Sequence, residues 1–443
     1  MRLVWSRRKS RWNLSASWLI AVLAVTAMAA DGHAADNEVK QRVKDVRELG
    51  KGDSASIPRI EPYLRDPETA VRLEAVKALI QIGTQRSLDP LIAATRDNDP
   101  EIQTRAVEGL VNFYVPGYIK TGVTGPIQRA GSAIKSKFSD TNDQAIEAYV
   151  QVRPDVIQAI GRVVSGGASL DARTSAARAA GILRGGAAVP DLIQALQSKD
   201  SRLIYESLIA LQKVHDGSAG PGVRFLLRDL DERVKLTAIE TSGILQDRGA
   251  INDLRDILDR SRSEKVKRAA LTSLAQIADP SSHALFKAYL TNKDDGLRTV
   301  ATEGLGRVRD DADGAMIEKA YNSEEKGALR LADAFALVRY GSTDMTEFGA
   351  LRYLVNQLNS AGGRDAAVAY LTEVARDKDV RRALYPALQS PSATKAEKTG
   401  LAQVLAVSGD RDTLPYLQTL SQDPDAEVAQ AGLRASRNLN ARL

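Results

Sequence analysis

From residue 71 onward, large apolar and small residues recur along the chain in one pattern. In Val71–Ile82 and again in Val266–Ile277, a large apolar residue is followed by a small residue at offset 4 and by large apolar residues at offsets 8 and 11. These offsets fall on one stripe of a helix with 3.6 residues per turn. The small residue would let a neighbouring helix approach closely. The pattern therefore predicts helices that bury one face.

The first residue of this pattern, here called the anchor, recurs at intervals of 31 or 32 residues over most of the chain. The anchors are Val71, Ile102, Ala172, Leu203, Val234, Val266, Leu297, Leu329 and Val428, with weaker units centred near Ala366 and Ala396. A shorter amphipathic segment with proline near its start precedes each long helix, as in Val189–Leu196, and proline is tolerated at that position. Acidic turns that suit N-caps join the two helices. The spacing predicts an all-α array of about eleven helix pairs.

The motif D-P-x-x-x-V-R-x-x-A-x-x-A-L-x-x-I-G, clearest at Asp66–Gly83, is similar to that of short HEAT repeats, especially those of the phycobilisome-lyase type. The resemblance covers roughly residues 54–113 and 152–440. It implies a right-handed α-solenoid of about eleven HEAT-like helix pairs. Because HEAT arrays include scaffolds, adaptors, lyases and repair enzymes, the resemblance is specific for the fold and poor for the function.

Residues 1–34 differ from the rest of the chain. Five basic residues between Arg2 and Arg11 precede the apolar run Leu19–Ala30, and small residues follow it. This order predicts a signal peptide that is cleaved after Ala29 or Ala34. An uncleaved membrane anchor is the alternative, but the run is shorter than the roughly 20 apolar residues that span a bilayer. We expect an exported protein, periplasmic or extracellular, that has no transmembrane segment once the leader is removed and can contact the envelope peripherally.

Removing this leader changes the composition of the chain. The formal net charge is +5, and residues 1–30 contribute five basic residues and no acidic one, so the mature chain is close to neutral. Near-neutral charge argues against nucleic acid as a partner. All three tryptophans, Trp5, Trp12 and Trp18, lie in the leader, so the mature chain lacks the best side chain for stacking on sugars. The chain has no cysteine, so no disulfide can stabilise it.

A basic residue directly follows the anchor in six repeats. These residues are Arg72, Arg173, Lys235, Lys267, Arg298 and Arg330. A line of cations along one face could bind a polyanion. The near-neutral charge favours a structural ladder instead, in which each cation pairs with the acidic turn of its own or a neighbouring repeat.

Residues 114–150 interrupt the pattern. The anchors Ile102 and Ala172 are 70 residues apart, where two repeats would need about 62. Between residues 114 and 139 the segment has four basic residues, no acidic residue and two tyrosines. Insertions on a repeat frame often carry binding specificity. The candidate partner-binding residues are Tyr114, Tyr118, Lys120, Arg129, Lys135 and Lys137. The alternative is a degenerate repeat whose aromatic residues form a local core.

Few residues suggest catalysis, and no metal or cofactor is expected. His33, His215 and His283 have no second histidine at metal-ligand spacing, and hydrolase and phosphate-binding motifs are missing. We interpret His215 and His283 as surface or capping residues. Asp333 occupies offset 4, where other repeats have a small residue, and burying a carboxylate there would be costly. We therefore expect a slight rotation that points Ala332 inward and Asp333 outward, near Arg330.

The sequence thus predicts four segments: a signal peptide (1–34), an N-terminal helix with the first repeats (35–113), the insertion (114–150), and a repeat array with a C-terminal cap (151–443). The predicted function is a non-catalytic scaffold or adaptor of the cell envelope. Its concave surface and the insertion would hold a partner protein. A lyase- or hydrolase-type enzyme built on a HEAT solenoid and an envelope-glycan-binding protein are the alternatives.

Overall fold

The computed structural model describes residues 36–119, 144–324 and 327–443. Within these ranges the regular elements are α-helices and 3-10 helices, without a strand. Most helices form pairs in which a short first helix is followed by a longer second one. The predicted all-α solenoid is confirmed. The chain divides into two units, Met1–Thr121 and Gly122–Leu443, so the boundary falls inside the predicted insertion.

Unit 1 contains a helix over residues 36–49 and two helix pairs. In the first pair, η1 (Ser54–Ser56), α2 (Ile57–Ile60) and η2 (Glu61–Arg65) precede α3 (Thr69–Ile82). In the second, η3 (Gln85–Ser87) and α4 (Leu88–Ala94) precede α5 (Pro100–Tyr114). Helix α3 packs against α5.

The described part of unit 2 contains nine pairs. The first five are α7 (Pro154–Gly166) with α8 (Leu170–Ile182), α9 (Val189–Ala195) with α10 (Ser201–Val214), α11 and η6 (Gly220–Val223, Arg224–Arg228) with α12 (Glu232–Ile244), α13 (Ile251–Arg260) with α14 (Glu264–Ile277), and α15 (His283–Tyr289) with α16 (Asp295–Val308). The last four are α17 (Gly314–Ser323) with α18 (Gly327–Arg339), α19 (Ala350–Asn356) with α20 (Arg364–Val374), α21 (Lys378–Gln389) with α22 (Lys395–Ser408), and α23 (Leu414–Leu420) with α24 (Ala426–Asn440).

One-turn 3-10 helices precede or extend several first helices of unit 2. They are η4 (Gly186–Ala188), η5 (Gly217–Ala219), η7 (Arg248–Ala250), η8 (Pro280–Ser282), η9 (Asp311–Asp313), η10 (Gln357–Asn359) and η11 (Arg411–Thr413). With the two pairs of unit 1, the described residues form eleven pairs, as the sequence predicts.

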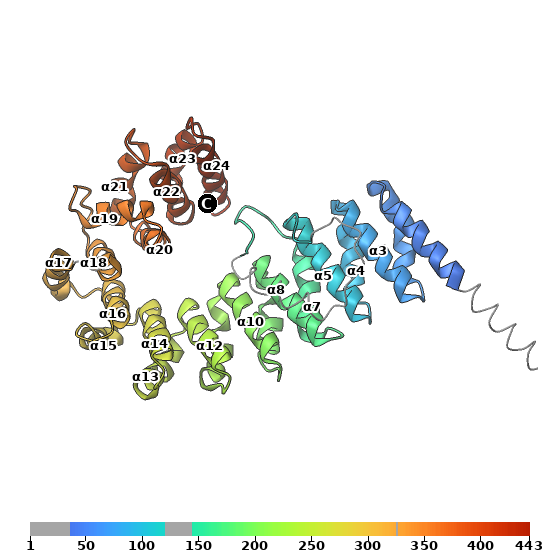
Figure 1. The fold of residues 1–443 in the computed structure, drawn as a ribbon, viewed down its shortest axis with the longest axis horizontal. Coiled ribbons are helices and arrows are strands. Elements are labelled where there is room, and N and C mark those ends of the chain that lie inside the picture. Colours follow the sequence, from blue (N-terminus) through green and yellow to red (C-terminus); the bar gives the residue numbers. More distant parts are fainter. Residues whose placement is uncertain (1–35, 120–143, 325–326) are drawn as a thin grey trace, which may run out of the picture. The chain divides into compact units, whose positions relative to one another are not determined.

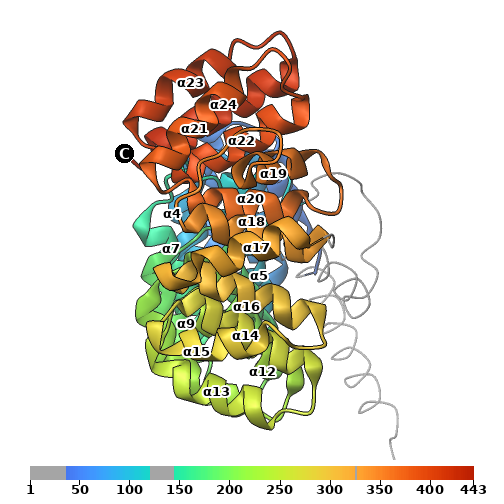
Figure 2. The same cartoon turned by 90° about the vertical axis from the view of Figure 1, so that its left-hand side faces the viewer.

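Within unit 2, each second helix packs against the second helix of the next pair, from α8 through to α24. Figure 1 shows these second helices on the inner side of the curve and first helices such as α13, α15 and α17 on its outer side. Figure 2 shows the helix pairs from α13 and α14 to α23 and α24 following one another in sequence order. The second helices, such as α16, therefore line the inside of the curve.

The anchors form the core. All nine are buried, and the most exposed of them, Leu329, is only 8% exposed. The position four residues later brings a second helix close to its own first helix. In the last pair it is Gly432, where an added Cβ would lie 2.6 Å from the backbone nitrogen of Ser421. The small residue predicted at offset 4 is thus explained by close helix packing.

Helix ends repeat as regularly as the core does. Asp99, Asp200, Asp231 and Asp425 are N-caps whose side chains accept hydrogen bonds from backbone N–H groups of the first turn. At the other end, five residues with left-handed backbone follow or end successive second helices at intervals of 31 or 32: Arg184, His215, Gln246, Ala278 and Arg309. None of them is glycine, although Gly83 occupies the same place after α3.

None of the helices in the described ranges is long and apolar enough to span a bilayer. The predicted signal peptide falls on residues 1–35, which lie outside those ranges.

Candidate functional site

The predicted insertion starts at the end of α5. Phe113 and Tyr114 pack edge to face with ring centroids 4.9 Å apart, and both are half-buried. The chain then turns at Gly117, and the backbone N–H of Ile119 donates to Oδ1 of Asn112 at 3.0 Å. Tyr118 is also half-buried. The other four candidate residues, Lys120, Arg129, Lys135 and Lys137, lie outside the described residues.

The last residues of the insertion pack onto unit 2. Ile146 is buried, and its N–H donates to the carbonyl oxygen of Ile182 at the end of α8 at 2.9 Å. Lys213 on α10 donates from Nζ to the carbonyl oxygen of Gln144 at 3.0 Å. The Nδ2 of Asn438 on α24 donates to Oε2 of Glu147 at 2.8 Å. Residues 144–147 therefore form part of the packed structure of this unit.

Three residues of the predicted cation ladder bind carboxylates. Arg72 Nε lies 2.7 Å from Oδ2 of Asp97 in the next turn, and its Nη1 donates to the carbonyl oxygen of Asp66 at 2.9 Å. Lys267 pairs with Glu264 at 2.8 Å, and Arg298 with Asp295 at 2.6 Å. The hydrogen bond to Asp97 raises the pKa of Arg72 above its ordinary value. These cations serve contacts inside the array.

The other ladder positions use different contacts. Arg173 donates from Nε to the carbonyl oxygen of Val164 at 2.9 Å, and Lys235 is half-buried. The guanidinium carbon of Arg330 lies 5.1 Å from the ring centroid of Tyr321 and 5.0 Å from that of Tyr353. Contacts of this kind stabilise a cation without a carboxylate.

The predicted outward orientation of Asp333 is wrong. Asp333 is only 2% exposed and Ala332 is fully buried. The reason is that α18 is enclosed on almost every side, since Leu331 and Phe335 are buried as well, so a small rotation brings no side of the helix into solvent. Oδ2 of Asp333 has no hydrogen-bond partner. Burial, with a smaller contribution from Glu324, raises the pKa of Asp333 to about 7.

His283, predicted to be a surface or capping residue, also contacts a carboxylate of the next repeat. Its Nε2 lies 2.5 Å from Oδ2 of Asp313 in the next repeat, and Nζ of Lys287 lies 2.8 Å from Oδ1 of the same carboxylate. Burial alone would raise the pKa of Asp313, but hydrogen bonds from Lys287 and His283 lower it below its ordinary value. The group links two consecutive repeats. His215 ends α10 with left-handed backbone.

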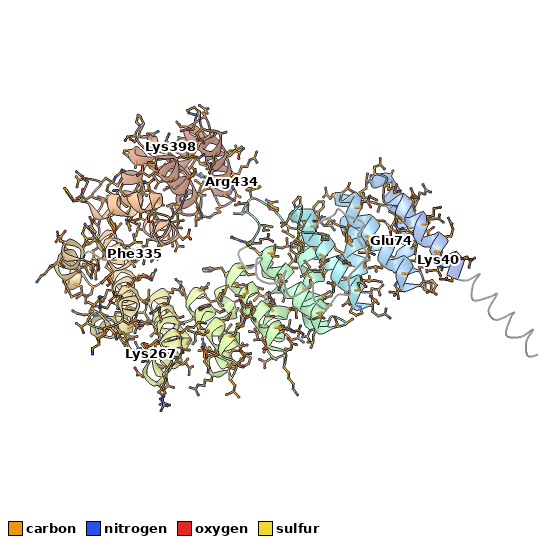
Figure 3. The ribbon with its side chains drawn as sticks, viewed as in Figure 1. Lys40, Glu74, Lys267, Phe335, Lys398 and Arg434 are labelled. Carbon is orange, nitrogen blue, oxygen red and sulfur yellow. The ribbon has the colours of Figure 1, made fainter. Side chains whose placement is uncertain are left out.

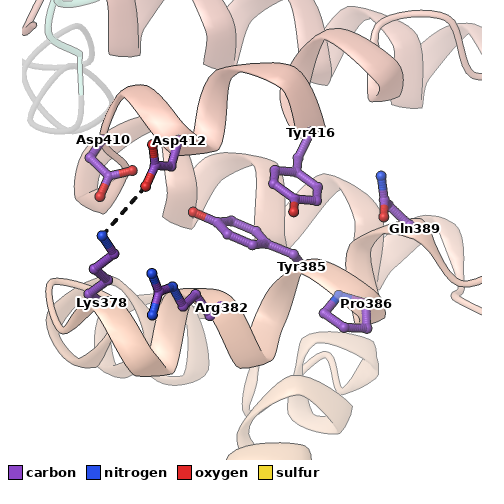
Figure 4. A pocket seen from close by; sticks show the side chains of 8 residues that line it. All are labelled: Lys378, Arg382, Tyr385, Pro386, Gln389, Asp410, Asp412 and Tyr416. Carbon is purple, nitrogen blue, oxygen red and sulfur yellow. Dashed lines mark ion pairs between the residues drawn. The ribbon is translucent and has the colours of Figure 1, made fainter.

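A groove of about 380 Å³ lies between α21 and α23. Figure 4 shows a charged end with Lys378 and Asp412, whose ionic groups are 3.6 Å apart, and an aromatic end. There the rings of Tyr385 and Tyr416 stack with centroids 3.9 Å apart. The lining has no serine, cysteine or histidine that could act as a nucleophile or as an imidazole base. The described residues also contain no group of three or more His, Cys, Asp or Glu side chains that could hold a metal ion.

A further cluster, which the sequence does not reveal, joins α16 to α20. It comprises Glu303, Arg307, Tyr370 and Glu373, with Phe335 of α18 between the two helices. The spacing of Glu303 and Arg307, four residues apart, predicts an ion pair on one helix. Their contacts with residues more than 60 positions away depend on the curvature of the array.

Comparison with known proteins gives a family match. A family model described as HEAT repeats matches residues 24–111, 189–270 and 251–338, which together make up more than half of the chain. A search of curated proteins finds no match. Several solved structures are similar at low sequence identity.

One of these structures is the complex of CpcE and CpcF of phycocyanin lyase from Nostoc sp. PCC7120, at 19% identity over 63% of this chain and 94% of that chain, with a TM-score of 0.35. A second is human deoxyhypusine hydroxylase, at 20% identity over 65% of this chain and 96% of that chain, with a TM-score of 0.25. A third is importin beta, at 13% identity over 95% of this chain and 66% of that chain, with a TM-score of 0.38.

The regions that the family model matches contain helix pairs with buried anchors, as in the rest of the described array. This chain belongs to the HEAT-repeat family.

Proposed function

We propose that this chain is a non-catalytic scaffold of the cell envelope that holds a partner protein, and that the insertion 114–150 supplies part of the contact. The fold is compatible with protein binding, because a repeat array offers an extended surface to a partner. The envelope location rests on the predicted signal peptide in residues 1–34.

The observation that carries the proposal is that both ends of the insertion are held on helices. At one end the backbone of Ile119 is hydrogen-bonded to the side chain of Asn112. At the other end the backbone of Ile146 is hydrogen-bonded to Ile182 at the end of α8. Backbone that is already ordered at each of these two attachment points costs less entropy to hold against a partner. The four basic residues of the insertion lie between these fixed ends, whereas most ladder cations have partners inside the array.

The test is capture of partners from envelope extracts by the tagged protein, with identification by mass spectrometry. One variant replaces residues 120–143 with a Gly/Ser segment of equal length, and a second changes Lys120, Arg129, Lys135 and Lys137 to Gln. We expect both variants to keep the helical circular-dichroism signal and to lose a protein that the unchanged chain captures.

The matched control changes four exposed arginines of the array to Gln, namely Arg260, Arg382, Arg434 and Arg437. This control should still capture the protein. If the insertion variants capture the same proteins as the unchanged chain, the insertion has no binding role. The location is tested separately by N-terminal sequencing of the protein from the envelope fraction, and an intact Met1 would contradict export with cleavage.

A further inference from the structure

Two second helices that are not neighbours in the array touch each other directly. The hydroxyl of Tyr370 on α20 donates to Oε1 of Glu303 on α16 at 2.6 Å. Nε of Arg307, also on α16, lies 3.0 Å from Oε2 of Glu373 on α20. Within α16, Nη1 of Arg307 donates to Oε2 of Glu303 at 3.1 Å. These bonds connect the pair α15–α16 to the pair α19–α20 and bypass the pair α17–α18 between them, which are the seventh, ninth and eighth pairs of the described residues.

The helix that is bypassed supplies an aromatic ring between the two. Phe335 of α18 is fully buried, and its ring stacks on that of Tyr370 with centroids 4.6 Å apart. The guanidinium carbon of Arg307 lies 5.1 Å from the centroid of the same Phe335 ring. Figure 3 labels Phe335 on α18, and Figure 1 shows α16, α18 and α20 following one another along the inner side of the curve. We call Glu303, Arg307, Phe335, Tyr370 and Glu373 the inner bridge.

The polar groups of the inner bridge are largely shielded from water. The side chains of Arg307 and Glu303 are 12% and 15% exposed, and that of Glu373 is 27% exposed. Burial alone would lower the pKa of Arg307, but the carboxylates of Glu303 and Glu373 raise it above its ordinary value. Each polar group has a partner with good geometry, and a shielded network of this kind is costly to break.

We propose that the inner bridge is a clamp that fixes the curvature of unit 2 at α18. In a repeat array each pair normally contacts only its neighbours, so the bend at each junction is set locally. Contacts between α16 and α20 exist only while the bend at α18 is tight, because straightening the array would move these two helices apart on the inner side. The bonds of the inner bridge therefore oppose opening, and a partner meets an inner surface whose shape is already set.

The chain has no cysteine, so pairs of introduced cysteines can carry spin labels for distance measurement by pulsed electron paramagnetic resonance. Arg262 and Gln422 are exposed and lie on opposite sides of the inner bridge in the sequence, so R262C/Q422C reports on the bend. Gln197 is also exposed, and Q197C/R262C reports on a stretch that does not include the bridge. The test variant is Tyr370→Phe with Glu373→Gln, which removes the hydrogen bond from Tyr370 to Glu303 and the charge that pairs with Arg307, while the side-chain shapes are kept.

We expect the distance distribution of R262C/Q422C to become broader and to move to longer distance in the test variant, while that of Q197C/R262C stays unchanged. The matched control is Lys398→Gln, which removes the 2.7 Å ion pair between Lys398 and Asp423 in consecutive repeats and should leave both distributions unchanged. An unchanged R262C/Q422C distribution in the test variant overturns the proposal. Equal broadening in the Lys398 control, or at Q197C/R262C, overturns it as well, because the effect would then be general loosening.

The double variant is compared only if its helical circular-dichroism signal equals that of the unchanged chain. If it does not fold, Tyr370→Phe alone is measured with the same label pairs. This single change removes the bond to Glu303 and keeps the ring on Phe335. An unchanged distribution in that variant contradicts a clamp in which Tyr370 takes part.

Discussion

Replacing Asp333 with asparagine should stabilise the α17–α18 pair, and the gain should grow with pH. In the folded chain the carboxyl is 2% exposed, Oδ2 has no hydrogen-bond partner, and Glu324 is the charged group that acts on it. These surroundings raise the pKa of Asp333 from 3.8 to about 7. The folded state therefore binds a proton that the unfolded state has already released between these two pH values, and folding loses stability as the pH rises through that range.

The size of the effect follows from the shift in pKa. One pKa unit corresponds to about 1.4 kcal/mol, so the ionised carboxylate costs about 4 kcal/mol of stability above pH 7. Below about pH 4 the cost vanishes, because the carboxyl is protonated in both states. The advantage of Asp333→Asn should therefore grow by about 3 kcal/mol between pH 4.5 and pH 8.

Hydrogen exchange of the α18 amides measures this advantage. A long repeat array need not unfold in one step, and exchange reports the opening of single segments. Comparing the two proteins at the same pH cancels the intrinsic pH dependence of exchange. The ratio of exchange rates should change by about 100-fold between the two pH values, since about 1.4 kcal/mol is tenfold. Asp311→Asn, at a side chain that is 88% exposed, is the control and should show no such trend. Parallel curves for Asp333→Asn and the unchanged chain would refute a buried carboxyl without a partner.

Three further substitutions probe single contacts. Gly304→Ala should destabilise the seventh repeat by about 1–3 kcal/mol, because the added Cβ would lie 2.7 Å from the buried ring of Phe286. Ala278→Gly should stabilise by about 1 kcal/mol, because Ala278 has a φ of 53° that glycine adopts without strain. Asp313→Asn should lower the melting temperature at neutral pH. The difference should disappear in acid, since the pKa of Asp313 is lowered in the folded state and its contribution is lost as the pH falls through that value.

Each of these has a matched comparison in thermal unfolding followed by circular dichroism. Gly314→Ala is the control for the glycine change, because its Cβ would make only an ordinary contact at 3.7 Å. Should Gly304→Ala leave the melting temperature unchanged, Phe286 has room to move. Gly83 already has left-handed backbone, so Gly83→Ala should destabilise where Ala278→Gly stabilises. A constant difference between Asp313→Asn and the unchanged chain from pH 3 to pH 7 would contradict the paired carboxylate.

The repeated core could be predicted from the sequence because it depends on local periodicity. Val71 and Val266 begin the same pattern, and each buries the same face of its helix. The left-handed ends were not predicted. Arg184, Gln246 and Arg309 have positive φ although none of them is glycine, the residue that signals this backbone in a sequence. The cost of burying a carboxylate predicts that Asp333 points outward, but Asp333 is buried, because α18 packs between two neighbouring repeats.

The candidate site could be predicted only in part. The break in the repeat at residue 114 is visible as a spacing change, and the boundary between the two units falls inside the insertion that begins there. The packing of residues 144–147 is not visible, because Ile146 contacts the far end of α8 and Glu147 contacts Asn438, 291 residues later. Contacts at such separations depend on how the array curves, which no short pattern encodes.

The contact between α16 and α20 also bears on how the protein unfolds. An array in which each repeat couples only to its neighbours can fray at any junction, and its melting is described by a chain of nearest-neighbour terms. The hydrogen bonds between α16 and α20 add a coupling free energy between two repeats that are not neighbours. The repeats from α15 to α20 should therefore open together as one cooperative block. A denaturation model with only nearest-neighbour coupling would then misjudge the cooperativity in this stretch of unit 2.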